Sequence, residues 1–127
     1  MNFNIVFKML GASPIAPVTP LPPYNPCGDV EVTCPPDADG FSSLRFSPVN
    51  DFFCASNWNN SVCVWEVQPA VLGRPPTAVP KAQNKDHQQP VLSTSWTPDG
   101  TQVFTAGCDK TARLWNLATN QSTQVRC

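Results

Sequence analysis

Short runs of alternating apolar and polar residues recur along most of the chain. In the first of them, Val30, Val32 and Cys34 alternate with polar residues, which is the period of a strand that buries one face. Further short runs are rich in Val, Phe, Trp, Ser and Cys and end at Pro, Asn or Asp; they occupy residues 41–46, 51–57 and 61–67. No stretch has the helical period of about 3.6 residues. The pattern therefore predicts an all-β chain that begins as a meander of short strands.

The second half of this meander repeats the first. Residues 43–67 match residues 93–117 without a gap, at a shift of 50 positions. The matched pairs include Ser43 with Ser93, Phe46 with Trp96, Pro48 with Pro98, Val64 with Leu114 and Trp65 with Trp115. In the second copy, Pro98-Asp99-Gly100 is a strong hairpin signal. A repeat of about 40–50 residues with three or four short strands is typical of a β-propeller blade.

Each copy gains an outer strand from the residues that follow it. Thr77–Gln83 contains a proline but can still form an edge strand, because an outer edge tolerates proline. Ser122–Val125 takes the same place in the second copy. The sequence thus predicts two four-stranded blades, the first at about residues 41–83 and the second at about residues 87–127.

The N-terminal part has a different composition. Six of the 15 prolines fall within residues 13–26, which removes too many amide donors for a helix or a central strand. Lys8 interrupts the apolar run of residues 3–10, whereas a secretory signal carries its positive charge before such a run. We interpret residues 1–27 as a disordered proline-rich tail and residues 28–127 as the folded part. The tail is interpreted as a spacer, with a ligand for an aromatic groove as the alternative.

Composition and charge exclude two classes of partner. Hydrophobic residues make up 41% of the chain and charged residues 13%, and the net charge is −1. Such a balance provides no broad basic face for non-specific nucleic-acid binding. No apolar run approaches the roughly 20 residues of a membrane helix, so membrane insertion is not expected.

The reactive residues form no recognisable catalytic or metal-binding motif. The six cysteines lack the C-x-x-C spacing of a zinc site, and without a secretory signal they are interpreted as free thiols. Cys54, Cys63 and Cys108 lie in apolar stretches and are expected to act as small core residues. No glycine-rich phosphate loop, G-x-S-x-G motif or paired-carboxylate spacing occurs. We therefore expect no enzyme activity, cofactor, metal or small-molecule substrate.

Several strings resemble the WD-repeat β-propeller family. His87-Gln88-Gln89-Pro90-Val91 resembles the opening of a WD-repeat blade, with Asp86 where glycine is usual. Ala106–Asn116 is similar to the closing stretch of the repeat, with Asn116 in place of the final Asp. Val79–Gln83 lies outside the generic repeat and is similar to the branch of the family that serves nuclear export of mRNA. The resemblance extends from about Gly28 to the end.

The resemblance implies a fold that this chain contains only in part. Propellers of this branch close with seven blades, and the sequence accounts for about two of them, so an incomplete ring is expected. The run at residues 29–34 resembles the outer strand of the last blade in such a ring. We accordingly expect the N-terminal portion of a propeller, either a fragment or a truncated gene product.

The resemblance also implies a structural network of hydrogen bonds inside each blade. Blades of the family join a buried His, a Ser or Thr, an Asp and a Trp, and a satisfied network of that kind makes a blade rigid. In the second copy the matching residues are His87, Asp109 and Trp115, with Ala106 at the Ser/Thr position and Thr105 beside it. In the first copy Ser56 and Trp65 match, and Asn59 replaces the Asp. The alternative, a catalytic pairing of His87 with Asp109, lacks an accompanying nucleophile motif.

The turns between the second and third strands form a candidate contact rim. Trp58, Asn59 and Asn60 lie in this turn of the first copy, and Lys110 lies in the same turn of the second. Propellers commonly bind peptides at such a rim, and an exposed Trp is a good interface anchor. The alternative is that Asn and Asp simply form the turns through bonds to their own backbone. Both interpretations can hold together.

The function implied by the resemblance is that of a non-catalytic interaction scaffold. Its expected partners are a nucleoporin peptide segment and mRNA ribonucleoprotein, the latter contacted indirectly or through blades that this chain does not contain. The expected location is the nucleus and the nuclear pore in the envelope, with shuttling to the cytoplasm. One alternative is a spindle-checkpoint propeller that binds kinetochore peptides, and another is a truncated fragment without function.

Overall fold

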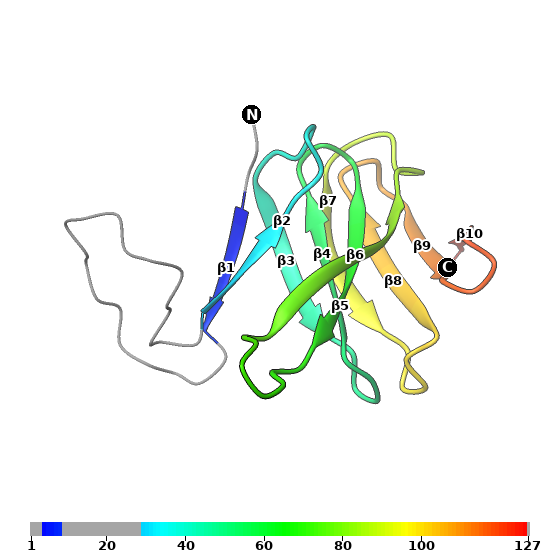
Figure 1. The fold of residues 1–127 in the computed structure, drawn as a ribbon. Helices are drawn as coiled ribbons and strands as arrows, with labels where there is room; N and C mark the ends of the chain where they lie inside the picture. Colours follow the sequence, from blue (N-terminus) through cyan, green and yellow to red (C-terminus); the bar gives the residue numbers. More distant parts are fainter. Residues whose placement is uncertain (1–3, 9–28, 127) are drawn as a thin grey trace.

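The computed structural model describes residues 4–8 and 29–126, and the described residues form ten strands and no helix (Figure 1). The strands are β1 (Asn4–Lys8), β2 (Asp29–Thr33), β3 (Phe41–Phe46), β4 (Phe52–Asn57), β5 (Val62–Gln68), β6 (Thr77–Asn84), β7 (Val91–Trp96), β8 (Gln102–Gly107), β9 (Ala112–Asn116) and β10 (Gln121–Val125). They form a two-stranded sheet, β1-β2, and two four-stranded antiparallel sheets, β3-β4-β5-β6 and β7-β8-β9-β10. The all-β class and the two four-stranded blades are confirmed, and the described sheets do not close into a ring.

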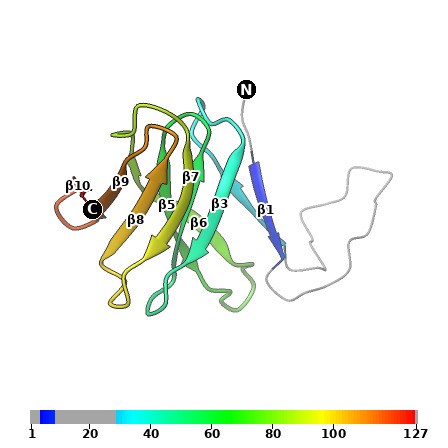
Figure 2. The ribbon, with the colours of Figure 1, turned by 180° about the vertical axis from the view of Figure 1, so that it is seen from behind.

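The two blades share their irregularities as well as their strands. The register shifts between Phe41 and Ser43 in the first blade and between Val91 and Ser93 in the second, one repeat apart. The innermost strands, β3 and β7, lie next to each other (Figure 2). The fifty-residue repeat seen in the sequence is therefore a repeat of backbone geometry.

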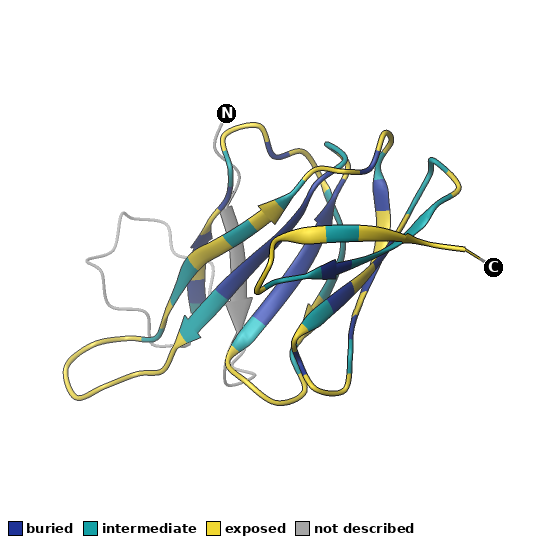
Figure 3. Cartoon of the chain, turned by 90° about the vertical axis from the view of Figure 1, so that its right-hand side faces the viewer, coloured by how far each residue is buried: buried dark blue, intermediate teal, exposed yellow. Residues whose placement is uncertain are grey.

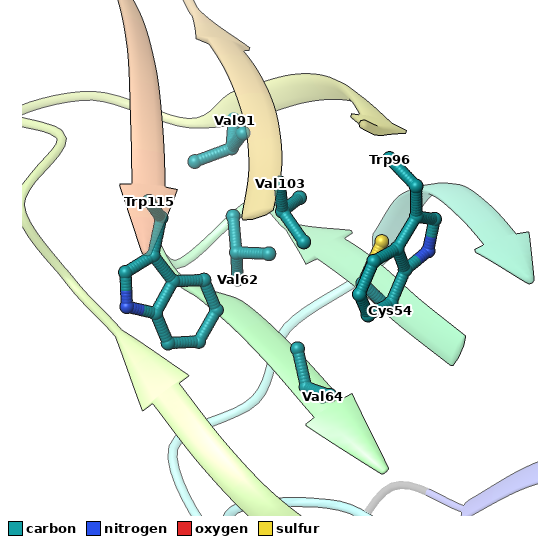
Figure 4. Packing of buried hydrophobic residues seen from close by; sticks show 7 residues of the cluster. All are labelled: Cys54, Val62, Val64, Val91, Trp96, Val103 and Trp115. Carbon is teal, nitrogen blue, oxygen red and sulfur yellow. The ribbon is translucent and has the colours of Figure 1, made fainter. Parts of the chain in front are cut away.

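One hydrophobic core lies between the blades. Figure 4 shows its buried side chains, which are Cys54, Val62 and Val64 from the first blade and Val91, Trp96, Val103 and Trp115 from the second. The Trp96 indole Nε1 donates a hydrogen bond of 2.9 Å to the carbonyl oxygen of Arg45 across the interface. A buried indole N–H needs such a partner, so this bond fixes the position of one blade against the other.

A second core joins the first blade to β2. Val30 and Val32 pack there with Phe53, Ala55 and Trp65. The Phe53 and Trp65 rings are stacked, with centroids 5.0 Å apart. The first blade is thus covered on both faces, whereas the outer face of the second blade carries exposed apolar residues (Figure 3).

The structure corrects the expected disordered tail at residues 4–8. These residues form β1, which pairs antiparallel with β2 from Asn4 opposite Thr33 to Lys8 opposite Asp29. The physical reason is that β2 has no other sheet partner among the described strands, so β1 pairs one of its two otherwise unpaired edges, and the Ile-Val-Phe run of β1 favours a strand. The proline-rich stretch at residues 13–26 lies outside the described residues.

Candidate protein-interaction rim

The candidate rim is built from one tight turn in each blade. The turn of residues 57–61 closes with a bond from the Asn57 N–H to the Ser61 carbonyl oxygen (2.9 Å), and the Gly107 N–H bonds the Thr111 oxygen in the same way (3.1 Å). Asn60 and Lys110 occupy equivalent positions with φ of 71° and 63°. Asn tolerates this left-handed conformation better than Lys does. The two turns therefore present equivalent side chains at one end of the molecule.

The side chains of these turns divide into structural and exposed ones. The Asn59 carboxamide oxygen accepts bonds from the Ser61 N–H (3.1 Å) and from the Ser61 hydroxyl. Trp58 is 48% exposed, and its backbone N–H donates a hydrogen bond to the Gly40 carbonyl oxygen at 2.9 Å. Lys110 is exposed and Asn60 is half-buried. Asn59 acts as a turn former, while Trp58 and Lys110 are accessible for contact.

A closed hydrogen-bond network supports the second-blade turn from below. His87 is only 3% exposed; its Nδ1 lies 2.9 Å from Asp109 Oδ2 and its Nε2 lies 2.7 Å from Thr105 Oγ1. A neutral ring with its proton on Nδ1 satisfies both contacts, because it donates to the carboxylate and accepts from the Thr105 hydroxyl. The Ser/Thr position of the network is thus filled by Thr105 and not by Ala106.

Asp109 is the most connected side chain of this network. Its Oδ1 accepts bonds from the Thr111 N–H (3.0 Å) and hydroxyl (2.7 Å), and its Oδ2 also accepts the Gln88 N–H at 3.0 Å. Burial alone would raise the pKa of Asp109, but these hydrogen bonds and that from His87 outweigh it and hold the pKa well below its ordinary value. The carboxylate is therefore charged at neutral pH and fastens the loop before β7 to the β8–β9 turn.

Gly107 provides the room for His87, a role that sequence analysis missed. A Cβ atom at position 107 would lie 2.7 Å from His87 Nδ1 and 3.0 Å from Asp109 Oδ1. The equivalent residue of the first blade is Asn57, whose side chain accepts the Asp39 N–H (3.0 Å) and donates to the Asp39 carbonyl oxygen (3.1 Å). A glycine aligned with an asparagine was the available signal in the sequence.

The two tryptophans lie outside the network implied by the family resemblance. The indole Nε1 of Trp115 donates to Asn120 Oδ1 at 3.0 Å, and that of Trp65 donates to the Thr33 carbonyl oxygen at 3.1 Å. Both side chains are buried in the two cores. In the first blade, Ser56 Oγ lies 2.7 Å from Ser42 Oγ, and Ser42 in turn donates to the Val91 carbonyl oxygen of the second blade. Ser56 thus links blades instead of joining a tryptophan.

The described groups that resemble a reactive centre are buried or already bonded to each other. The contact of His87 with the Asp109 carboxylate on one side and the Thr105 hydroxyl on the other resembles a catalytic arrangement. However, His87 and Thr105 are buried and bonded to each other. Burial raises the pKa of the Cys54 and Cys63 thiols to about 11, which keeps them protonated and weakly nucleophilic. Among described residues, no group of three or more metal-ligating side chains occurs, and no helix could cross a membrane.

The free thiols agree with the expectation from the sequence. Cys34, Cys54, Cys63 and Cys108 are free. Cys54 and Cys63 are core residues, as expected, whereas Cys108 is only half-buried. Cys27 and Cys127 lie outside the described part of the chain.

Two of the cationic side chains that the structure describes are paired with acids. Lys81 Nζ lies 2.5 Å from Glu66 Oε2, and Lys85 Nζ lies 2.6 Å from Asp37 Oδ2. The side chains of both ion pairs are at least one-third exposed to solvent, so the pairs add little to the stability of the fold. They do neutralise two of the eight Lys and Arg side chains of the chain.

Comparison with known proteins agrees with this architecture. The family model "WD domain, G-beta repeat" matches residues 27–66 and 79–116. The chain is 49% identical over 105 residues to proteins named mRNA export factor from Xenopus tropicalis and Danio rerio, and 46% identical to that from Mus musculus. Each alignment covers 80% of this chain and 27% of the relative, so the chain spans about a quarter of the length of these relatives.

Proposed function

The chain belongs to the WD-repeat family, and we propose that it is a non-catalytic interaction scaffold that takes part in nuclear export of mRNA. The observation that carries this proposal is the 46–49% identity to mRNA export factors over 105 residues, which is 80% of this chain. The same similarity supports a location in the nucleus and at the nuclear pore, with shuttling to the cytoplasm. The domain boundaries that we propose for this function are an N-terminal segment at residues 1–27, which contributes β1, and a partial propeller at residues 28–127.

We infer that the rim docks a nucleoporin peptide segment. Trp58 offers a large and half-exposed aromatic surface, and the turn that carries it is fixed by backbone bonds on both sides. Interfaces derive most of their binding energy from a few such aromatic or cationic anchors on rigid elements. Asn60 in the same turn and Lys110 in the equivalent turn of the second blade supply polar contacts, and Asn59 holds the first turn.

The structural network serves this docking by keeping the rim rigid. His87 and Asp109 fasten the second turn, and the buried Trp65 and Trp115 fix the strands beneath the two turns. A preorganised surface loses little conformational entropy on binding. We therefore assign His87, Asp109, Trp115, Ser56 and Trp65 a structural role.

Association with mRNA ribonucleoprotein is proposed to run through protein partners. Proteins that bind the RNA backbone directly need clustered Lys and Arg side chains. Here Lys81 and Lys85 are paired with acids, and the net charge is −1. Filter binding of the chain to poly(A) RNA is expected to show no saturable affinity below about 100 µM at physiological salt, the weak end of non-specific binding. Tight, salt-dependent RNA binding would contradict this part of the proposal.

Fluorescence anisotropy with a labelled nucleoporin segment tests the docking rim. Trp58→Ala is expected to weaken binding by roughly 10-fold or more, because hot-spot side chains contribute about 1.4 kcal/mol or more. Lys110→Ala is expected to have a smaller effect. The matched control is Val49→Ala, which truncates an apolar residue that is 60% exposed in the β3–β4 turn.

Two outcomes would overturn docking at this rim. One is binding that Trp58→Ala and Val49→Ala affect equally, and the other is no binding by the unmutated chain. A kinetochore peptide is run in parallel. Preference for that peptide over the nucleoporin segment would favour the spindle-checkpoint function instead.

A further inference from the structure

An open hollow lies over the rim end of the second blade, where the end of β8, the start of β9 and the end of β10 meet. Its volume is about 630 Å³, and its lining includes the small residues Ala106, Gly107 and Ala112. In place of Gly107 and Ala112, the first blade has the larger and buried side chains of Asn57 and Val62. β10, which borders the hollow, is mostly exposed (Figure 3). The second blade is therefore open where the first blade is filled by side chains.

Two cationic side chains line this hollow, and none of its described lining residues is acidic. The cations are Lys110 in the β8–β9 turn and Arg126 directly after β10, and both residues are exposed. Neither forms an ion pair with another residue that the structure describes. A carboxylate in the hollow therefore meets two unpaired positive charges. The planar guanidinium of Arg126 can also hold a carboxylate through two parallel N–H bonds.

The acids of this end of the blade are occupied elsewhere. The Asp109 carboxylate is only 9% exposed and accepts hydrogen bonds from three neighbouring residues on the inner side of the turn. Hydrogen bonds from Ser122 and Asn84, together with the nearby charge of Arg113, lower the pKa of Asp86. The charge of Asp86 is thus offset by Arg113, and the charge of Asp109 offsets at most one of the two lining cations. The hollow keeps a positive charge.

The backbone of Lys110 also indicates a task beyond turn formation. Its φ of 63° is left-handed, and the equivalent residue of the first blade is Asn60, with a φ of 71°. Asn adopts this conformation with less strain than Lys, so an Asn would form the turn at a lower cost. Unfavourable backbone conformations of this kind concentrate at functional sites. The exposed ammonium group of Lys110 is the feature that an Asn would not supply.

We propose that this hollow binds the carboxylate side chains of an extended acidic peptide segment. The inference rests on the proposed docking of a peptide at the rim, and it states the chemistry of that peptide beside the second blade. Lys110 and Arg126 hold the carboxylates, while the small residues at the strand ends let the peptide backbone approach the sheet. RNA is the less suitable polyanion, because no described lining residue offers an aromatic ring for a base to stack on. Two cations also provide too few phosphate contacts for tight binding.

Fluorescence anisotropy of two short labelled peptides with the 127-residue chain tests this site. One peptide alternates glutamate with serine, and the other alternates glutamine with serine, so the two differ in charge and hardly in shape. At low salt, the unmutated chain is expected to bind the glutamate peptide about 10-fold more tightly than the glutamine peptide. Most of this difference is expected to disappear at high salt, because exposed charges are then screened.

Three variants locate the binding site on the chain. Lys110→Asn introduces the residue of the equivalent turn in the first blade, so the turn is expected to be preserved. Lys110→Asn and Arg126→Gln are each expected to weaken binding of the glutamate peptide roughly 3-fold, and their combination roughly 10-fold. Arg74→Gln is the matched control. It removes an exposed positive charge from the connection between β5 and β6, and it is expected to leave the binding unchanged.

Three results would overturn the acidic-peptide site. The first is equal binding of the two peptides, and the second is an Arg74→Gln variant that weakens binding as much as Lys110→Asn and Arg126→Gln do. The third is a uridine oligonucleotide of the same charge that displaces the glutamate peptide better than unlabelled glutamate peptide does, which would make the hollow an RNA contact. Failure of the docking function itself is a different result, because it appears as a nucleoporin segment whose binding does not depend on Trp58.

Discussion

At the scale of single residues, His87 shows how one buried polar side chain can organise several segments. It contacts Thr105 on β8 and Asp109 in the β8–β9 turn, while it belongs to the loop that precedes β7. Such a group is costly to bury unless every donor and acceptor is satisfied. Asp109 meets that condition with bonds from His87, Gln88 and Thr111.

Asp109→Asn is expected to lower the free energy of unfolding by about 1–3 kcal/mol at pH 7. Both carboxylate oxygens of Asp109 accept hydrogen bonds, and the amide NH₂ group that replaces one of them would face other donors instead. The pKa of Asp109 in the folded chain lies below the unfolded value of about 3.9. Its contribution is therefore complete above about pH 4 and is lost as the pH falls through the folded pKa. Urea unfolding at pH 7, 5 and 3 is expected to show a gap between the two proteins that narrows only at pH 3.

Asp51→Asn serves as the control for this measurement. Asp51 is an exposed carboxylate in the β3–β4 turn, and its variant is expected to unfold like the unmutated chain at each pH. A gap for Asp109→Asn that stays the same at pH 3 would show that the carboxylate charge contributes nothing to stability.

At the scale of elements, the two blades fill the same place beneath their rim in different ways. The second blade uses His87 and leaves position 107 as glycine. In the first blade the residue one repeat before His87 is Asp37, which is exposed and paired with Lys85. The buried side chain beneath the first rim turn is that of Asn57, which is bonded to Asp39. A side chain at position 107 is therefore incompatible with His87, whereas the first blade, which has no histidine there, has room for Asn57.

The close approach of position 107 to His87 predicts that substitutions at these two positions have non-additive effects on the free energy of unfolding. Gly107→Asn alone is expected to cost about 1–3 kcal/mol, because its side chain would collide with His87. His87→Asp alone is expected to cost a similar amount, since it leaves the Thr105 hydroxyl without its acceptor. In the double variant the His87 ring is absent, so the side chain introduced at position 107 no longer collides with it. A double-mutant cycle from urea unfolding is expected to show the double variant at least about 1 kcal/mol more stable than the sum of the singles. Free-energy changes of the two single variants that simply add up in the double variant would contradict this prediction.

The sequence predicted the elements well because their signals are local. Alternating residues, turn prolines and the Pro98-Asp99-Gly100 hairpin give the strands of both blades, including the outer strands β6 and β10. Hydrogen-bond partners across the fold were not predictable in this way. The indole of Trp65 bonds the backbone of Thr33, which lies 32 residues earlier in the chain. The pairing of β1 with β2 was missed for the same reason, because it depends on an edge that only the folded chain creates.

At the scale of the whole molecule, stability is unevenly distributed between the blades. The first blade is packed between the second blade on one face and β2 on the other, so Phe53, Ala55 and Trp65 are fully buried. The second blade has one packed face, and Leu92 and Phe104 on its outer face are 45% and 41% exposed. Covered elements of this kind usually unfold last.

The pairing of β1 with β2 makes the N-terminal residues part of the fold, with a measurable effect on stability. Deleting residues 1–8 is expected to leave one edge of β2 unpaired over five positions, from Asp29 to Thr33. Net contributions of about 0.5–1.5 kcal/mol for each backbone hydrogen bond, offset by the entropy of ordering the strand, predict a loss of about 1–3 kcal/mol.

For a domain of this size, a loss of that amount lowers the melting temperature by roughly 5 °C or more. Hydrogen exchange of the β2 amides that bond to β1 is expected to accelerate more than that of β8. The Val6→Pro substitution removes one backbone donor from β1 without shortening the chain and is expected to act in the same direction. Unchanged melting and unchanged exchange in both variants would mean that β1 adds nothing to the stability of the blades, and that β2 is held by its packing on Phe53 and Trp65 alone.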